Sequence, residues 1–173
     1  MPQIFSTSRA EAIIYRFPPF FYPVVMLLAV VLQAYLPLIT RVAVYLDFPL
    51  LVVVYLAMTG RNQVTSMLTG SFLGLVQDSL SNLALGVNGI PKTLAGYLAS
   101  SLGVRIDADH PGVRLLVVFV LYWINALVVV ACQRYLMARP VSLNVAAVAL
   151  AAFVNALAGI FLFRVFDRFR RTD

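Results

Sequence analysis

Asp78 and Lys92 are the charged side chains in the middle of this sequence on which polar chemistry would depend. Asp78 ends one predicted helix and Lys92 begins the next, and Gly86, Gly89 and Pro91 lie in the connection between them. A charge inside a membrane costs several kcal/mol unless it is paired, faces a cavity or reaches the interface. We therefore expect the two residues to lie near the outer interface and to form an ion pair. The alternative is that each side chain extends separately to water.

Other groups of polar residues are weak candidates for catalysis or metal binding. Asp107, Asp109 and His110 bring together two carboxylates and an imidazole that could bind a metal ion, but such a loop is more often simply solvated. One Cys and one His in the whole chain argue against a zinc site. A proton or ion pathway would need a relay of ionisable groups through the membrane. We expect no enzymatic activity, no metal and no cofactor.

Small residues recur at every fourth position on three predicted helices. These faces are Ser66, Gly70, Gly74 and Asp78; then Lys92, Gly96 and Ser100; then Ala147, Ala151, Asn155 and Gly159. Small residues let two helix backbones approach closely, which is how helices associate in lipid. Packing within the chain is one interpretation. Docking of a partner's transmembrane helix on one face is the other.

The composition excludes several classes of protein. Of 173 residues, 62% are hydrophobic and only 12% are charged, against about 45–50% and about 25% in soluble domains. This excludes an ordinary soluble enzyme, a disordered regulator and a nucleic-acid-binding module. The net charge of +6 comes from arginines in short loops and tails, where they set membrane topology. We expect one integral membrane domain over residues 1–173, of the all-α class.

Six segments are candidates for membrane-crossing helices. They are residues 17–40, 42–58, 63–80, 89–104, 115–133 and 140–163. The first contains 24 uncharged residues, too many for the core of a signal peptide, and its helix should begin near Phe21. The third and fourth are weakly apolar, so they could instead form a re-entrant pair between four crossings. We favour six crossings, because each weak segment is long enough to cross a hydrocarbon core of about 30 Å if short or tilted.

Arginine positions predict the orientation. With a cytoplasmic N-terminus and six crossings, nine arginines are cytoplasmic, three are external, and Lys92 lies at the boundary. This excess follows the positive-inside rule. It predicts a cytoplasmic N-terminal tail over residues 1–16 and a basic cytoplasmic C-terminal tail over residues 164–173. Four crossings with a re-entrant pair give the same count.

Four ordered segments resemble the rod shape-determining protein MreD family. They are Asp-Phe-Pro-Leu-Leu-Val-Val-Val-Tyr-Leu-Ala at residues 47–57, Gly-Ser-Phe-Leu-Gly-Leu-Val-Gln-Asp-Ser-Leu-Ser at 70–81, Leu-Gly-Val-Asn-Gly at 85–89 and Lys-Thr-Leu-Ala-Gly-Tyr-Leu at 92–98. The size and the basic C-terminal tail agree, so the resemblance covers most of the chain. Gln77 departs from the pattern, since many family members are apolar there.

The resemblance implies a bacterial inner-membrane protein of the cell-elongation machinery. Members of that family bind MreC and act with MreB, RodA and a class B penicillin-binding transpeptidase in lateral peptidoglycan synthesis. They are thought to share a six-helix fold with the substrate-binding component of energy-coupling vitamin importers. We therefore expect a non-enzymatic scaffold surrounded by membrane lipid, which docks a single-span partner such as MreC.

Seven residues are the candidate site, in a structural or partner-binding role: Gly70, Gly74, Asp78, Gly86, Gly89, Lys92 and Gly96. Asp78, Gly86, Gly89 and Lys92 should maintain the hairpin that faces the partner, and the other glycines should allow close packing. The rival function is a substrate-capture subunit of a vitamin importer. That function needs an outward pocket with convergent polar groups, which Asp78, Asn88 and Lys92 could supply.

Overall fold

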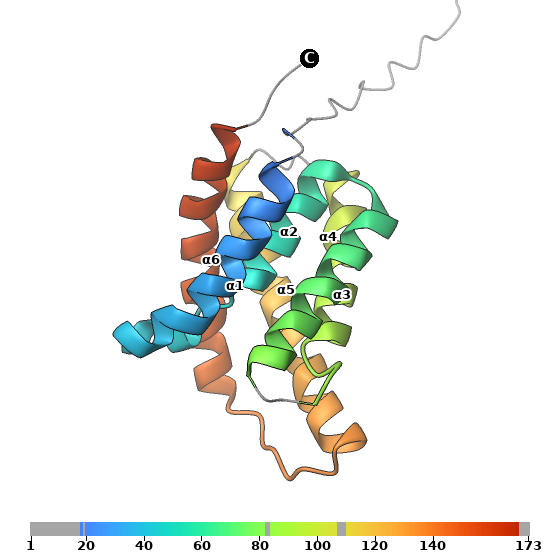
Figure 1. Ribbon diagram of the computed structural model, residues 1–173, viewed down its shortest axis with the longest axis vertical. Helices are drawn as coiled ribbons and strands as arrows, with labels where there is room; N and C mark the ends of the chain where they lie inside the picture. The colour runs from blue at the N-terminus through green and yellow to red at the C-terminus, as the bar shows by residue number, and fades with distance from the viewer. Residues whose placement is uncertain (1–17, 19, 82–83, 107–109, 170–173) are drawn as a thin grey trace, which may run out of the picture.

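The computed structural model describes residues 18, 20–81, 84–106 and 110–169, and all the regular secondary structure among these residues is helical (Figure 1). Asp107 and Asp109 of the candidate metal loop, and the predicted N-terminal tail, lie outside them. The elements in order are α1 (Phe21–Ile39), η1 (Arg41–Tyr45), α2 (Phe48–Gly60), α3 (Gln63–Leu80), α4 (Gly89–Gly103), α5 (Pro111–Ala131), η2 (Cys132–Leu136) and α6 (Val145–Asp167). The predicted all-α class is confirmed.

Capping residues explain where the helices begin. Asn62 accepts a hydrogen bond from the Thr65 N–H, so α3 starts at the predicted residue. Asp47 caps α2 in the same way, which divides the predicted 42–58 helix into η1 and α2. The fifth helix begins four residues early, at Pro111, a residue favoured in the first turn. The sixth begins five residues late, at Val145, because Asn144 caps it.

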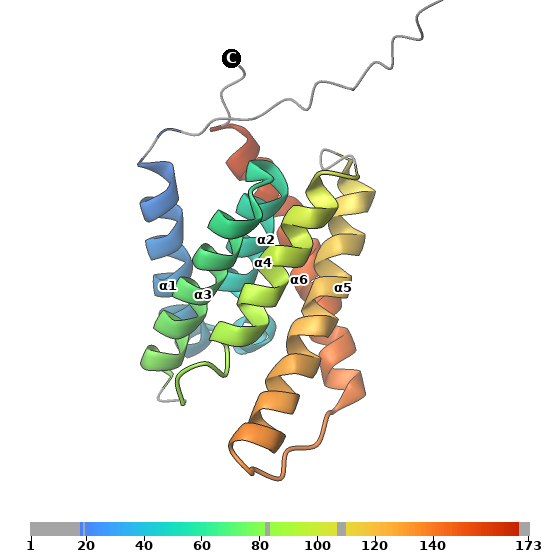
Figure 2. The ribbon, with the colours of Figure 1, turned by 90° about the vertical axis from the view of Figure 1, so that its right-hand side faces the viewer.

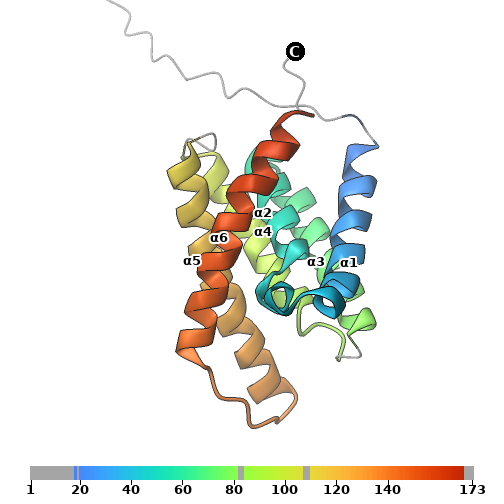
Figure 3. The same cartoon turned by 90° about the vertical axis from the view of Figure 1, so that its left-hand side faces the viewer.

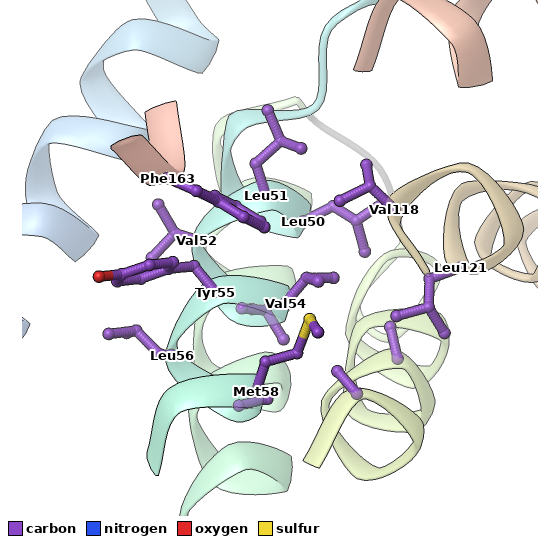
Figure 4. Packing of buried hydrophobic residues seen from close by; sticks show 14 of the residues in the cluster. Leu50, Leu51, Val52, Val54, Tyr55, Leu56, Met58, Val118, Leu121 and Phe163 are labelled. Atoms are coloured by element: carbon purple, nitrogen blue, oxygen red, sulfur yellow. The ribbon is translucent and has the colours of Figure 1, made fainter. Parts of the chain in front are cut away.

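Helix α2 is the centre of the bundle. All of residues 49–59 are buried, as expected of a helix that is apolar on every side. Helices α1, α3, α4, α5 and α6 all contact it (Figure 2). Its Tyr55 ring lies 5.1 Å from the Phe163 ring of α6, among the aliphatic side chains of the core (Figure 4).

Among the described residues, three helices are long and apolar enough to cross a membrane: α1, α5 continued through η2, and α6. Helix α2 is apolar but has only 13 residues. The structure therefore supports an integral membrane protein, while six crossings remain a prediction. The first residues of α1 and the last of α6 lie at the same end of the bundle (Figure 3), which agrees with an even number of crossings.

Candidate functional site

The carboxylate of Asp78 organises the connection between α3 and α4. Asp78 is fully buried. Its oxygens accept hydrogen bonds from the backbone N–H groups of Gly86 (2.9 Å), Asn88 (3.0 Å) and Gly89 (3.3 Å), and from the Asn88 side chain (2.9 Å). These donors replace the water that a buried carboxylate loses. Asp78 therefore fixes the path of the chain into α4.

Gly86 has a backbone conformation that favours glycine. Its φ is +103°, a region that L residues disfavour by about 1–2 kcal/mol. This conformation lets its N–H point at the Asp78 carboxylate. The requirement comes from the backbone alone, because a Cβ at Gly86 would have no neighbour closer than 3.8 Å.

We expect Gly86→Ala to lower the free energy of unfolding by about 1–2 kcal/mol, measured by thermal unfolding in mild detergent. Gly60→Ala is the matched control, since Gly60 lies in α2, a Cβ there meets nothing within 4 Å, and its φ is not positive. Alanine is the better helix former, so this control should be neutral or slightly stabilising. Equal effects of the two substitutions would show that the turn conformation at Gly86 is unimportant.

Lys92 is paired with Asp47, and the predicted ion pair with Asp78 is wrong. The Lys92 ammonium lies 2.8 Å from Asp47 Oδ2, and the Lys92 side chain is completely buried. The backbone of the α3–α4 connection already satisfies Asp78, while Lys92 faces the start of α2. Since Asp78 and Lys92 are both 0% exposed, neither reaches water as the snorkelling alternative requires.

Asp47 joins α2 to α4 and α6 at one point. Its Oδ1 accepts from the Leu50 N–H (3.0 Å), and its own N–H donates to Asn155 Oδ1 (2.9 Å). Asn155 Nδ2 donates in turn to the carbonyls of Tyr45 (2.6 Å) and Ala151 (2.8 Å). The chain entering α2 is therefore tied to α6 through the fully buried Asn155.

Gln33 of α1 hydrogen-bonds to the backbone on either side of Asp47, so α1 is also linked to this group of residues. Its Nε2 donates to the Leu46 carbonyl (3.2 Å), and its Oε1 accepts from the Phe48 N–H (3.0 Å). We call Gln33, Asp47, Lys92 and Asn155 the Asp47 junction. Neither Gln33 nor Asp47 was among the residues predicted for the site. Their signals were a lone amide inside an apolar helix and a carboxylate directly before an apolar run.

The small-residue faces lie between helices of the same chain. A Cβ at Gly70 would lie 2.2 Å from the Lys92 carbonyl oxygen, and one at Gly96 would lie 2.4 Å from that of Ser66. A Cβ at Gly74 would lie 2.5 Å from the Asn88 carbonyl oxygen. Helix α4 therefore covers the face of α3 that was a candidate for docking a partner. Of the two interpretations of these small-residue faces, packing within the chain rather than docking of a partner's helix, the geometry shows the first.

A second, partly buried ion pair links α5 and α6 at the opposite end of the bundle. Arg114 Nη1 of α5 lies 2.6 Å from Asp167 Oδ2 of α6, and the Tyr55 hydroxyl donates to Asp167 Oδ1 (3.0 Å). Arg114 was expected in a cytoplasmic loop but is only 6% exposed. Helix α6 continues past the predicted end at residue 163 to Asp167, whose carboxylate is held by α2 and α5.

The convergent pocket required of a vitamin importer is not formed by the residues proposed for it. Asp78 and Lys92 are fully buried, and neither they nor Asn88 line any of five cavities in the described part of the chain. Asp78 and Asn88 bond to each other, and Lys92 bonds to Asp47. The polar residues in the middle of the sequence thus hold helices together.

The profile of the family described as rod shape-determining protein MreD matches residues 15–171 of the chain. The chain belongs to the MreD family. This MreD-family chain therefore has a role in rod shape determination, and its family consists of structural, shape-determining proteins. Together with the family, the three long apolar helices among the described residues indicate an integral inner-membrane protein. No curated protein and no solved structure matches it, so a fold shared with vitamin importers remains a prediction.

The structure brings together the four segments that carry the MreD resemblance. Asp47 of the first segment pairs with Lys92 of the fourth. Asp78 of the second bonds to Gly86 and Asn88 of the third. The MreD-like residues thus build one interlocked unit from α2, α3 and α4, and the candidate site is primarily this unit.

Proposed function

We propose that the protein is a non-enzymatic inner-membrane scaffold of the bacterial cell-elongation machinery. In this proposal it binds MreC and acts with RodA and a class B penicillin-binding transpeptidase, with MreB on the cytoplasmic side, to support lateral peptidoglycan synthesis and rod shape. Both chain termini are cytoplasmic. The observation that carries the proposal is the family match over residues 15–171. The interlocked motif residues support it, since they stiffen a surface rather than surround a substrate.

The docking surface we propose is the outer side of α3 and α4. An apolar cavity of about 500 Å³ opens there. Its lining, which we call the α3–α4 groove, is Met67, Ser71, Leu75, Gly86, Gly89, Ile90, Thr93, Leu94 and Tyr97. Small residues form its floor and large apolar side chains its walls, the pattern into which a partner's apolar helix packs. The Asp47 junction and Asp78 hold this surface rigid from behind.

A substitution that fills the groove tests the proposal. We expect Leu94→Trp to reduce co-purification of MreC from mild detergent by about tenfold or more, because a central anchor position is blocked. Leu94 is 37% exposed, so the variant should reach the membrane at the normal level and unfold at the normal temperature.

Leu157→Trp is the matched control, because Leu157 is a comparably exposed leucine on α6, away from the groove. It should retain both MreC and rod shape in a complementation assay. Normal MreC capture by Leu94→Trp would remove the α3–α4 groove from the interface. Loss of MreC in both variants would indicate that another surface is involved.

A further inference from the structure

The connection from η2 to α6 contains an open cavity that is lined by two arginines. The cavity has a volume of about 440 Å³, and this connection lies at the end of the bundle opposite the C-terminus (Figure 1). Its lining, which we call the α5–α6 loop cavity, is Arg134, Ala138, Arg139, Pro140, Val141 and Ser142. In the predicted topology, two of the three external arginines therefore line one cavity, although the positive-inside rule disfavours arginine on that side.

The backbone brings the two arginines together. The Arg139 N–H donates to the Gln133 carbonyl (3.1 Å), so the chain that leaves η2 turns back beside Arg134. Ala138 makes this turn with a φ of +51°, a left-handed conformation that residues other than glycine adopt rarely. Such backbone conformations are concentrated at binding and catalytic sites. The fold thus holds both arginines at the same cavity.

Neither guanidinium group is neutralised by the described part of the chain. Arg134 and Arg139 are exposed, and neither belongs to its ion pairs. The described acidic residues all bind other groups of the chain: Asp47, Asp78 and Asp167. Guanidinium groups only donate hydrogen bonds, and their planar pairs of N–H groups match the oxygens of a phosphate. The cavity therefore suits a phosphate group.

The length of the helices places the cavity among the lipid headgroups. Helix α5 continued through η2 has 26 residues, which is about 39 Å at about 1.5 Å per residue. This is longer than a hydrocarbon core of about 30 Å but shorter than a whole bilayer of about 40–45 Å. Next to Arg134 in the sequence, Tyr135 and Leu136 are exposed, and tyrosine is typical of the membrane interface. An occupant that meets both groups of side chains carries an anionic group beside an apolar part.

We propose that the α5–α6 loop cavity binds the phosphate of an acidic glycerophospholipid from the leaflet at this end of the bundle, the outer one in the predicted topology. Arg134 and Arg139 donate to the phosphate oxygens, and the acyl chains lie against Tyr135 and Leu136. Phosphatidylglycerol fits, because its headgroup has a net negative charge. The ammonium group of phosphatidylethanolamine would meet two cations and no carboxylate, so this lipid binds more weakly. The site is separate from the α3–α4 groove.

Native mass spectrometry of the purified chain tests this proposal, in detergent micelles doped with equal amounts of phosphatidylglycerol and phosphatidylethanolamine. We expect the wild type to retain phosphatidylglycerol about fivefold better. The Arg134→Gln Arg139→Gln variant should retain about 25-fold less of it, about fivefold for each arginine, and unfold at the wild-type temperature. Arg105→Gln Arg164→Gln is the matched control, since it removes two exposed arginines from the opposite end of the bundle. It should retain phosphatidylglycerol like the wild type.

Four results would overturn the proposal. The first is a folded wild-type chain without the preference for phosphatidylglycerol. The second is an equal loss in the two double variants, which would show attraction to net charge alone. The third is displacement of the lipid by an equal concentration of inorganic phosphate, which would show a site for free anions. The fourth is an Arg134→Gln Arg139→Gln variant that keeps its lipid but loses MreC, which would assign the cavity to an acidic segment of the partner. The lipid measurement uses the chain alone, so it is independent of MreC binding.

Discussion

Gly74→Leu should prevent stable folding rather than remove a partner from a folded protein. A Cβ at Gly74 would lie 2.5 Å from the Asn88 carbonyl oxygen and 2.6 Å from the Gly89 Cα. These are backbone atoms of the turn held by Asp78, so they cannot move aside cheaply. We expect a loss of about 3 kcal/mol or more in the free energy of unfolding, measured by thermal unfolding in mild detergent and by the protein level in membranes.

The Gly60→Leu variant controls for placing a leucine at a glycine position, because a Cβ at Gly60 meets nothing within 4 Å. It should accumulate normally. Leu94→Trp gives the complementary contrast, in which MreC is lost while the fold is retained. If Gly74→Leu instead accumulated and unfolded like the wild type but no longer bound MreC, the α3 face would belong to the partner, and the packing of α4 against it would be wrong.

Local signals in the sequence predicted the bounds of the helices more reliably than they predicted which helices contact one another. The predicted 63–80 segment coincides with α3, and the 89–104 segment ends one residue past α4. Caps, glycines and prolines act within a few residues, so they can be recognised without the fold. The division of residues 42–58 into η1 and α2 was not predicted. Asp47 interrupts the apolar pattern there, but a single charged residue in an otherwise continuous apolar run does not by itself show that the helix is broken. The membrane crossings of α3 and α4 remain a prediction.

The partners of polar residues could not be predicted in the same way. Asp78 and Lys92 are close in sequence, whereas the actual partner of Lys92 lies 45 residues away. Periodicity shows that a charge lies on the same face as small residues, but it does not show which helix covers that face. Asn155 hydrogen-bonds across the bundle. Its exact partners, Asp47 and Tyr45, depend on how α6 packs against η1.

Lys92→Met should destabilise the protein strongly, because it leaves the Asp47 carboxylate without its cation. Lys92 is fully buried and the Asp47 side chain is 13% exposed, so water replaces little of the lost interaction. Breaking a buried ion pair by removing one partner typically costs about 3–5 kcal/mol. We expect a loss of this order in the free energy of unfolding, with a matching decrease in the protein level in membranes.

Asp47→Asn in the same background identifies the pair. Asparagine retains an acceptor for the Leu50 N–H, so the α2 cap survives while the charge is removed. The Asp47→Asn Lys92→Met double variant should therefore be no less stable than Lys92→Met alone, with a coupling energy of about 2 kcal/mol. Asp78 shares no hydrogen bond with Lys92, so Asp78→Asn and Lys92→Met should be nearly additive. Coupling of Lys92 to Asp78 rather than to Asp47 would reverse the assignment of the junction, because only residues that share an interaction depart from additivity by this amount.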